Sequence, residues 1–218
     1  LGQASFTTAT AATTQNGLRA PQGISIDDNG RLWVADFDNN RVLRFGNAAA
    51  KANGANADGV LGQTNFTSAV QATTQNGMRL PTGVEADIYG SVWVADYANN
   101  RILRFDRAAA KANGGNADGV LGQANFTSAV AATTQSGMNL PYAVTVDTNG
   151  RPWVSDGANR RAIYFGPLPN MSVLGQGQVI ANGDTTPSTV DDTDFGGVIL
   201  GANRDRTFTI SNTGIDAL

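Results

Sequence analysis

The chain has 218 residues, of which 41% are hydrophobic and only 15% charged, and its formal net charge is −3. This balance argues against a nucleic-acid surface, which needs a clustered excess of Lys and Arg. No apolar run approaches the ~18 residues of a membrane span. The absence of cysteine and histidine excludes disulfides, thiol nucleophiles, histidine bases and the usual zinc sites.

An internal repeat dominates the sequence. The tripeptide Leu-Gly-Gln begins at Leu1 and recurs at Leu61, Leu121 and Leu174, so that two steps of 60 residues are followed by one of 53. The first two units align with each other without a gap. Self-similarity at a fixed period is the signature of a repeat architecture, in which neighbouring units bury a shared core.

Each unit predicts four short strands joined by tight turns. In the first unit, alternating apolar residues and the turn signals Asp-Asn-Gly and Asp-Asn-Asn place the strands near residues 24–27, 31–36, 41–45 and 59–62. The first strands of the three units start near Gly23, Gly83 and Ala143. Alanine runs predict short helices over about Ala48–Ala52 and Ala108–Ala112. Hairpins at this spacing make an antiparallel meander.

The third unit departs from the other two after Phe165. A short segment with two prolines, Gly166–Asn170, replaces the alanine run, and this shorter link accounts for the 53-residue step. After Gln176 the composition shifts to acidic, turn-rich stretches. We therefore predict two domains, residues 1–176 with the repeats and residues 177–218 with a different module.

A four-stranded unit with tryptophan and aspartate in fixed phase is typical of a propeller blade. The second unit closely resembles the NHL repeat, and the first matches nearly as well; the third departs at Ser155, Arg160 and Ala162. The residues that carry the resemblance are Leu80–Val84, Asp87, Gly90, Val92–Asp96, Asn99–Ile102 and Phe105. The resemblance implies a β-propeller, most often with six blades. We therefore predict an all-β fold of three four-stranded antiparallel blades in an open arc.

The tail carries a different resemblance. The alternating segment from Arg206 to Ser211 predicts a strand. With the acidic turns before it, this part of the chain resembles the start of an immunoglobulin-like module of the choice-of-anchor D kind, found in bacterial surface and secreted proteins. A complete sandwich needs about 100 residues. We therefore expect an incomplete, β-sandwich-like module.

Three residue types recur at the same positions of every blade and allow two interpretations. Asp and Arg could form a reaction centre, and Trp could form a stacking ladder for a sugar or a base. We favour structural roles, because a reaction centre usually draws different residues from different blades: Asp accepts backbone N–H groups, Arg braces neighbouring blades and Trp packs between them. The positions are Trp33, Asp36, Arg41, Trp93, Asp96, Arg101, Trp153, Asp156 and Arg161.

A ligand site is expected where equivalent loop positions expose large side chains. The turn between strands two and three carries Phe37 and then Tyr97, while the entry to strand one carries Arg19, Arg79 and, in the third unit, Tyr142. In propellers these two sets of loops emerge on the same face, and aromatics beside arginine suit a polar ligand or a protein partner. The alternative is that the aromatic residues merely cap their blades.

No catalytic residue, metal site or cofactor is predicted. The turns that contain Asp58 and Asp118, and the acidic tail at Asp191, Asp192 and Asp194, carry oxygen ligands of the kind that calcium prefers. Calcium therefore stays an alternative. The closing glutamate of a full calcium loop is missing, however, and ordinary turns explain these residues equally well.

The sequence favours a non-catalytic binding or scaffold module of a bacterial extracellular or cell-surface protein, whose loops meet a protein, a glycan or a small ligand. The NHL resemblance leaves two alternatives. A metal-assisted lyase or lactonase-type hydrolase would lean on His and Glu, but Glu85 is the single glutamate of the chain. An RNA-binding propeller would need a basic face.

Three blades do not close a ring. An open arc leaves apolar faces and strand edges uncovered at both ends. We therefore expect completion either by missing blades or by a second copy of the chain, which would make a six-bladed homodimer.

Overall fold

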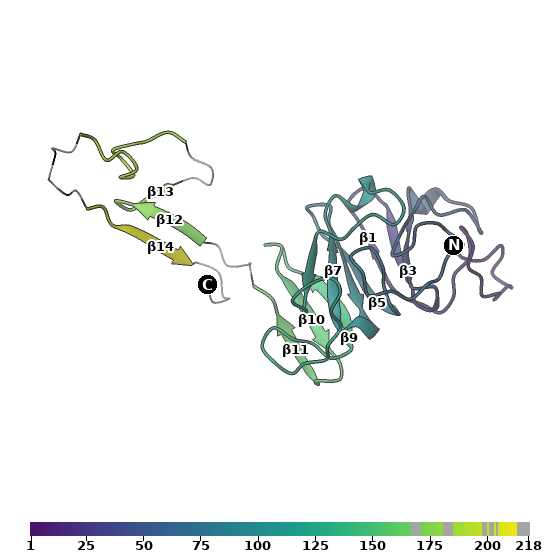
Figure 1. The fold of residues 1–218 in the computed structure, drawn as a ribbon. Coiled ribbons are helices and arrows are strands. Elements are labelled where there is room, and N and C mark those ends of the chain that lie inside the picture. The colour runs from purple at the N-terminus through teal and green to yellow at the C-terminus, as the bar shows by residue number, and fades with distance from the viewer. Residues whose placement is uncertain (167–170, 181–184, 198–199, 201–202, 204, 213–218) are drawn as a thin grey trace. The chain divides into compact units, whose positions relative to one another are not determined.

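The computed structural model forms two compact units, Leu1–Phe165 and Gly166–Leu218. The residues that it describes are 1–166, 171–180, 185–197, 200, 203 and 205–212. The first unit holds three antiparallel sheets in chain order (Figure 1). The all-β prediction is thereby confirmed, and the sheets form an open arc.

The first two sheets are four-stranded meanders with identical topology. The first contains β1 (Pro21–Ile26), β2 (Leu32–Asp36), β3 (Arg41–Phe45) and β4 (Gly59–Leu61). The second contains β5 (Pro81–Ala86), β6 (Val92–Asp96), β7 (Arg101–Phe105) and β8 (Gly119–Leu121). In both, a register shift interrupts the pairing of the first two strands just after the initial proline. We call these two sheets blade 1 and blade 2.

Blade 3 corrects the prediction of a fourth strand. It contains β9 (Pro141–Val146), β10 (Pro152–Asp156) and β11 (Arg161–Tyr164). The segment around Leu174, where the fourth strand is expected, forms β12 (Met171–Gly175) in a different sheet. The link from Phe165 to Leu174 has 9 positions, against 16 from Phe45 to Leu61 in the first unit. It is therefore too short to repeat the return path of the other blades.

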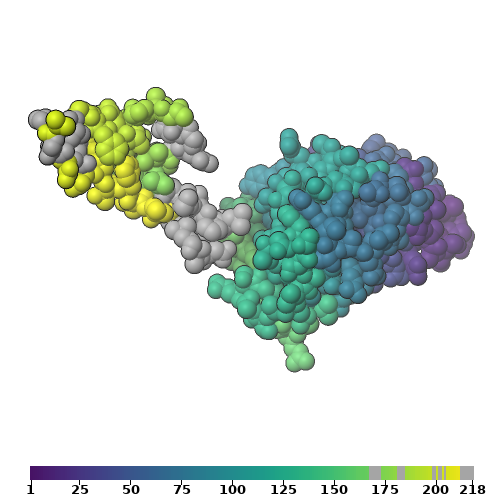
Figure 2. Space-filling model, viewed as in Figure 1, coloured from purple at the N-terminus to yellow at the C-terminus, as the bar shows by residue number. Residues whose placement is uncertain are grey.

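The core of the first unit lies between the blades rather than inside any one of them. Because side chains alternate between the two faces of a strand, each blade has two apolar faces to cover. Trp33 and Val42 of blade 1 pack on Val94 and Leu103 of blade 2 in one buried cluster. The first strands β1, β5 and β9 lie side by side, so the blades converge there (Figure 1). The packed side chains give this unit a continuous surface (Figure 2).

Single turns of 3₁₀-helix mark two places in blades 1 and 2. Those at Ala48–Ala50 and Ala108–Ala110 lie where short helices are predicted, but each ends at the lysine that follows, which is extended. The turns predicted between the second and third strands also take this form, at Phe37–Asn39 and Tyr97–Asn99. Each of the latter ends on an asparagine with left-handed backbone angles, a conformation that asparagine tolerates better than most residues.

In the second unit, β12 pairs antiparallel with both β13 (Gln178–Ile180) and β14 (Phe208–Asn212). The last of these confirms the strand expected after Arg206. The repeat places the end of the first domain at residue 176, whereas the compact units meet between Phe165 and Gly166. Within the described residues, no helix is long and apolar enough to cross a membrane.

Candidate functional site

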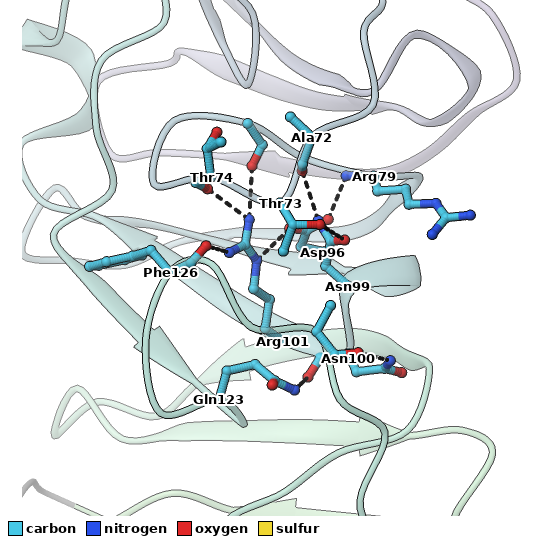
Figure 3. A network of polar contacts seen from close by, with 12 residues as sticks. Ala72, Thr73, Thr74, Arg79, Asp96, Asn99, Asn100, Arg101, Gln123 and Phe126 are labelled. Carbon is cyan, nitrogen blue, oxygen red and sulfur yellow. Dashed lines mark hydrogen bonds and ion pairs between the residues drawn. The ribbon is translucent and has the colours of Figure 1, made fainter.

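The carboxylate of Asp96 lies at the end of β6 and is fully buried. It accepts a hydrogen bond from the Arg101 guanidinium at 2.7 Å and from the Asn99 amide at 2.9 Å (Figure 3). Its other oxygen accepts the backbone N–H of Arg79 at 2.6 Å. Both oxygens of the carboxylate are therefore engaged within the protein.

The guanidinium of Arg101 holds two linkers as well as Asp96 (Figure 3). Its Nη2 donates to the carbonyl oxygens of Thr74 at 2.9 Å and Gly77 at 3.0 Å, which precede blade 2. Its Nη1 donates to the carbonyl oxygen of Phe126, which follows blade 2. Arg101 thus joins the two segments that enter and leave its blade.

The same clamp recurs in the other two blades. Arg41 donates to Asp36 at 2.7 Å with both side chains fully buried, and Arg161 donates to Asp156 at 2.8 Å. The Arg161 side chain is 28% exposed, and its blade is the last sheet of the first unit. An arrangement that every blade repeats, with its polar atoms already bonded, acts as a structural clamp.

The tryptophans of blades 1 and 2 are anchored by carboxylates. The indole N–H of Trp33 donates to Asp27 at 3.1 Å, and that of Trp93 donates to Asp87 at 2.8 Å. Burial opposes ionisation of Asp27, but hydrogen bonds from Arg31 and Trp33 outweigh it and lower the pKa of this carboxyl. Both indoles are buried, so neither presents a stacking surface.

Trp153, at the same position in blade 3, is 46% exposed. Its ring centroid lies 4.8 Å from that of Tyr164, and the guanidinium of Arg151 lies 5.8 Å from the Tyr164 ring. In blades 1 and 2 an arginine occupies the position of Tyr164. The structure therefore exposes one aromatic pair that the repeat pattern does not predict.

The three aromatic residues predicted at the ligand face form one row across the blades. The ring centroids of Phe37 and Tyr97 are 6.5 Å apart, and those of Tyr97 and Tyr142 are 5.8 Å apart in an edge-on contact. Phe37 and Tyr97 are half-buried, and Tyr142 is 53% exposed. The row therefore keeps contact with solvent.

Two arginines lie beside this row, at the same end of their blades. The backbone N–H of Asp38 donates to the carbonyl oxygen of Arg19 at 3.2 Å, and that of Ala98 donates to the carbonyl oxygen of Arg79 at 3.1 Å. Both arginines are exposed, and Arg19 also pairs with Asp38 at 3.3 Å. We call the five residues of this surface, Arg19, Phe37, Arg79, Tyr97 and Tyr142, the aromatic rim.

Glu85 joins the first strands of all three blades. Its carboxylate accepts a hydrogen bond from Ser25 of blade 1 at 3.3 Å and another from Thr145 of blade 3. These three residues occupy the same repeat position, so the 60-residue period is the signal in the sequence that brings them together. Burial raises the pKa of Glu85, and the nearby charge of Asp87 adds to the effect.

We expect Glu85→Gln to raise the melting temperature at neutral pH. A carboxyl whose pKa is raised by folding favours the folded state when protonated, and it loses that advantage as the pH rises through its folded pKa. A neutral glutamine avoids the cost of burying the charge. Melting curves of both chains across the acid range should therefore converge as the pH falls. A gap that widens in acid would contradict this account.

Within the described residues, no three Asp or Glu side chains gather as a metal-binding group. In the tail, Asp191 accepts the backbone N–H and the hydroxyl of Thr193, and Asp192 pairs with Arg206 at 2.8 Å. Asp194 accepts the N–H of Gly196. These carboxylates are engaged in turns and an ion pair, so calcium stays a prediction without a described ligand cluster.

Comparisons with known proteins give limited similarity. No curated protein matches the sequence. Among solved structures, a gluconolactonase from Xanthomonas campestris is 19% identical with a TM-score of 0.42, over 66% of this chain and 37% of that one. Virginiamycin B lyase from Staphylococcus aureus is 18% identical with a TM-score of 0.39, over 74% of this chain and 45% of that one. The chain thus spans less than half of either protein.

A family model covers the part of the chain that forms most of blade 1. The matched segment includes β1, β2 and β3 together with the Asp36–Arg41 clamp and the rim residues Arg19 and Phe37. Residues 18–45 match the NHL repeat.

Proposed function

We propose that the chain is a non-catalytic binding module of an extracellular or cell-surface protein, and that the aromatic rim holds its ligand. The observation that carries this proposal is the row of three touching aromatic rings, one from each blade. Rigid aromatic side chains provide contact area at low cost in conformational entropy, which makes them suited to recognition.

The two arginines add positive charge to the same surface. Arg79 is exposed, and none of the described carboxylates forms an ion pair with its guanidinium. A guanidinium on a surface that also carries aromatic rings can bind the carbonyl or carboxylate groups of a peptide, or the hydroxyls of a glycan. A polar ligand with an apolar edge, such as a protein segment or a sugar chain, therefore fits the rim better than a purely apolar one.

The test compares the ligands that bind the intact rim with those that bind an altered rim. A phage-displayed peptide library and an array of oligosaccharides are each probed with the natural chain and with the double variant Arg79→Ala, Tyr97→Ala. We expect binders of the natural chain to lose most of their signal on the variant, while its melting temperature changes by only a few degrees.

A matched control lies at the other end of blade 2. Tyr89 is 63% exposed and Arg107 is exposed, so Tyr89→Ala, Arg107→Ala removes the same two residue types away from the rim. Binding should survive in this control. Binders that persist on the rim variant, or a chain that selects none from either collection, would refute the proposal.

The enzymatic alternative has less support from the side chains present. A metal-assisted lyase or hydrolase needs carboxylates free to hold a metal, whereas the Glu85 carboxylate already accepts hydrogen bonds from two neighbouring blades. Metal-dependent hydrolysis of lactones by the natural chain, abolished in Glu85→Gln, would favour that alternative over a binding role.

A further inference from the structure

Each blade has one face turned toward the preceding blade, its leading face, and one toward the following blade, its trailing face. Val84 and Val144 on the leading faces of blades 2 and 3 are 5% and 6% exposed. At the same position of blade 1, Ile24 is 65% exposed, and Ile26 beside it is 62% exposed. On the same face of blade 1, Val34 and Leu43 are already buried in a cluster with residues of their own unit. The uncovered part of this leading face is therefore the apolar strip along β1, which carries the residue types that pack when a blade precedes it.

The trailing faces require a glycine where the blades converge. A Cβ atom added to Gly23 would lie 2.6 Å from the carbonyl oxygen of Thr82 in blade 2. A Cβ atom added to Gly83 would lie 2.8 Å from the Cα atom of Ala143 in blade 3. Blade 3 carries that Cβ atom, because Ala143 takes the place of the glycine. A following blade could not approach blade 3 as closely as blades 1 and 2 are approached.

An asparagine fastens each trailing face to the next linker. Asn40 accepts the backbone N–H of Leu80 at 2.9 Å through its side-chain oxygen, and its side-chain amide donates to Ala69 at 3.0 Å. Asn100 makes the same two bonds to the linker before blade 3, and its carbonyl oxygen accepts from a glutamine (Figure 3). At this position blade 3 has Arg160, whose side chain has no acceptor.

Two further positions of the blade 3 trailing face become more polar or smaller, and a third keeps its tryptophan. Ser155 stands for Ala35 and Ala95, Ala162 for Val42 and Ile102, and exposed Trp153 for buried Trp33 and Trp93.

We propose that the stack of blades is directional: it accepts a further blade of the same repeat only ahead of blade 1, and blade 3 is its end. The occupant of the exposed β1 strip is a preceding repeat unit with a glycine and an asparagine at the positions of Gly23 and Asn40. Blades 1 and 2 define this chemistry, because their trailing faces cover the leading faces that follow them.

The same reasoning disfavours a ring made by two copies of this chain. In such a ring, the trailing face of blade 3 would pack on the leading face of blade 1 in the other copy. Ala143 would meet the backbone there, and Arg160 could not accept the linker N–H that Asn40 and Asn100 accept. The added repeat unit therefore fits as an extension of the arc ahead of blade 1, and the second copy does not fit.

Two extended chains test the direction of stacking. One carries a second copy of residues 61–120 ahead of Leu1, and the other carries a second copy of residues 46–105 inserted between Phe165 and Gly166. Hydroxyl-radical footprinting read by mass spectrometry reports the exposure of individual side chains in each chain. Melting temperatures are recorded alongside.

The first extension should protect Ile24 and Ile26 several-fold and raise the melting temperature by several degrees. The second should leave labelling of Trp153 unchanged. Adding Ala143→Gly and Arg160→Asn to the second chain should then protect Trp153. Protection of Trp153 without these substitutions, or persistent labelling of the two isoleucines in the first chain, would overturn the proposal.

A measurement on the chain without extensions covers the case in which an inserted copy fails to fold. By light scattering, the natural chain should remain a monomer at concentrations where the variant Ala143→Gly, Arg160→Asn associates head to tail. Adding Ile24→Asp to the double variant should restore the monomer. The proposal fails if the natural chain associates and Ile24→Asp prevents it, or if the double variant stays monomeric.

Discussion

Replacing Arg101 by methionine is expected to lower the free energy of unfolding by about 3–5 kcal/mol, the usual cost of leaving one partner of a buried ion pair without the other. Asp96 would remain fully buried with its charge uncompensated. The carbonyl oxygens of Thr74, Gly77 and Phe126 would also lose their donor. Denaturation in urea, followed by tryptophan fluorescence, measures the change.

The matched control is Arg161→Met, at the same position of blade 3. Its side chain is 28% exposed, so water can solvate Asp156 once the guanidinium is gone, and the loss should be clearly smaller. If the free energy of unfolding falls equally in both variants, burial does not determine how much the clamp stabilises the fold.

Trp33→Ala is expected to lower the free energy of unfolding by about 3–5 kcal/mol, because it empties a closely packed position between blades 1 and 2. The indole is 2% exposed, and it packs against the leading face of blade 2. Trp153→Ala removes the same side chain from blade 3, where it is 46% exposed and contacts Tyr164. We expect the free energy of unfolding to fall by less than half as much in Trp153→Ala as in Trp33→Ala. Urea midpoints of the two variants, measured side by side, decide the comparison.

An equal fall in the free energy of unfolding of the two tryptophan variants would mean that the indole stabilises its own blade rather than the contact with the next blade. A large loss at Trp33 alone would assign the stabilisation to the contact between blades. The pair therefore separates packing within a blade from packing between blades.

The strands of the repeats could be predicted from the sequence because period-two alternation and turn residues are local signals that occur three times. The same signals placed Trp33 within β2 and Asp36 at its end. The aromatic rim could be anticipated from chain order, since antiparallel strands bring Arg19 and Phe37 to the same end of a blade. Its binding role stays a proposal.

The features that the sequence does not predict depend on contacts between units. A fourth strand for blade 3 was expected because Leu174 repeats a motif, but the motif does not encode the length of the link before it. Glu85 and Asn40 looked like ordinary strand and turn residues. Their hydrogen bonds run to other blades, and no periodicity within one unit reveals them.

The clamp around Arg41 reaches beyond the unit that is repeated. Its guanidinium binds the carbonyl of Thr14, which precedes the blade, and that of Phe66, which belongs to the next unit. A piece cut after residue 60 would contain the first carbonyl but not the second. The segment that can be transplanted is therefore longer than the segment that is duplicated, and successive transplantable modules overlap. Tandem duplication beside an existing copy supplies the missing carbonyl at once, whereas a single unit moved to another protein arrives without it. This geometry favours growth of the array in place over dispersal of single blades.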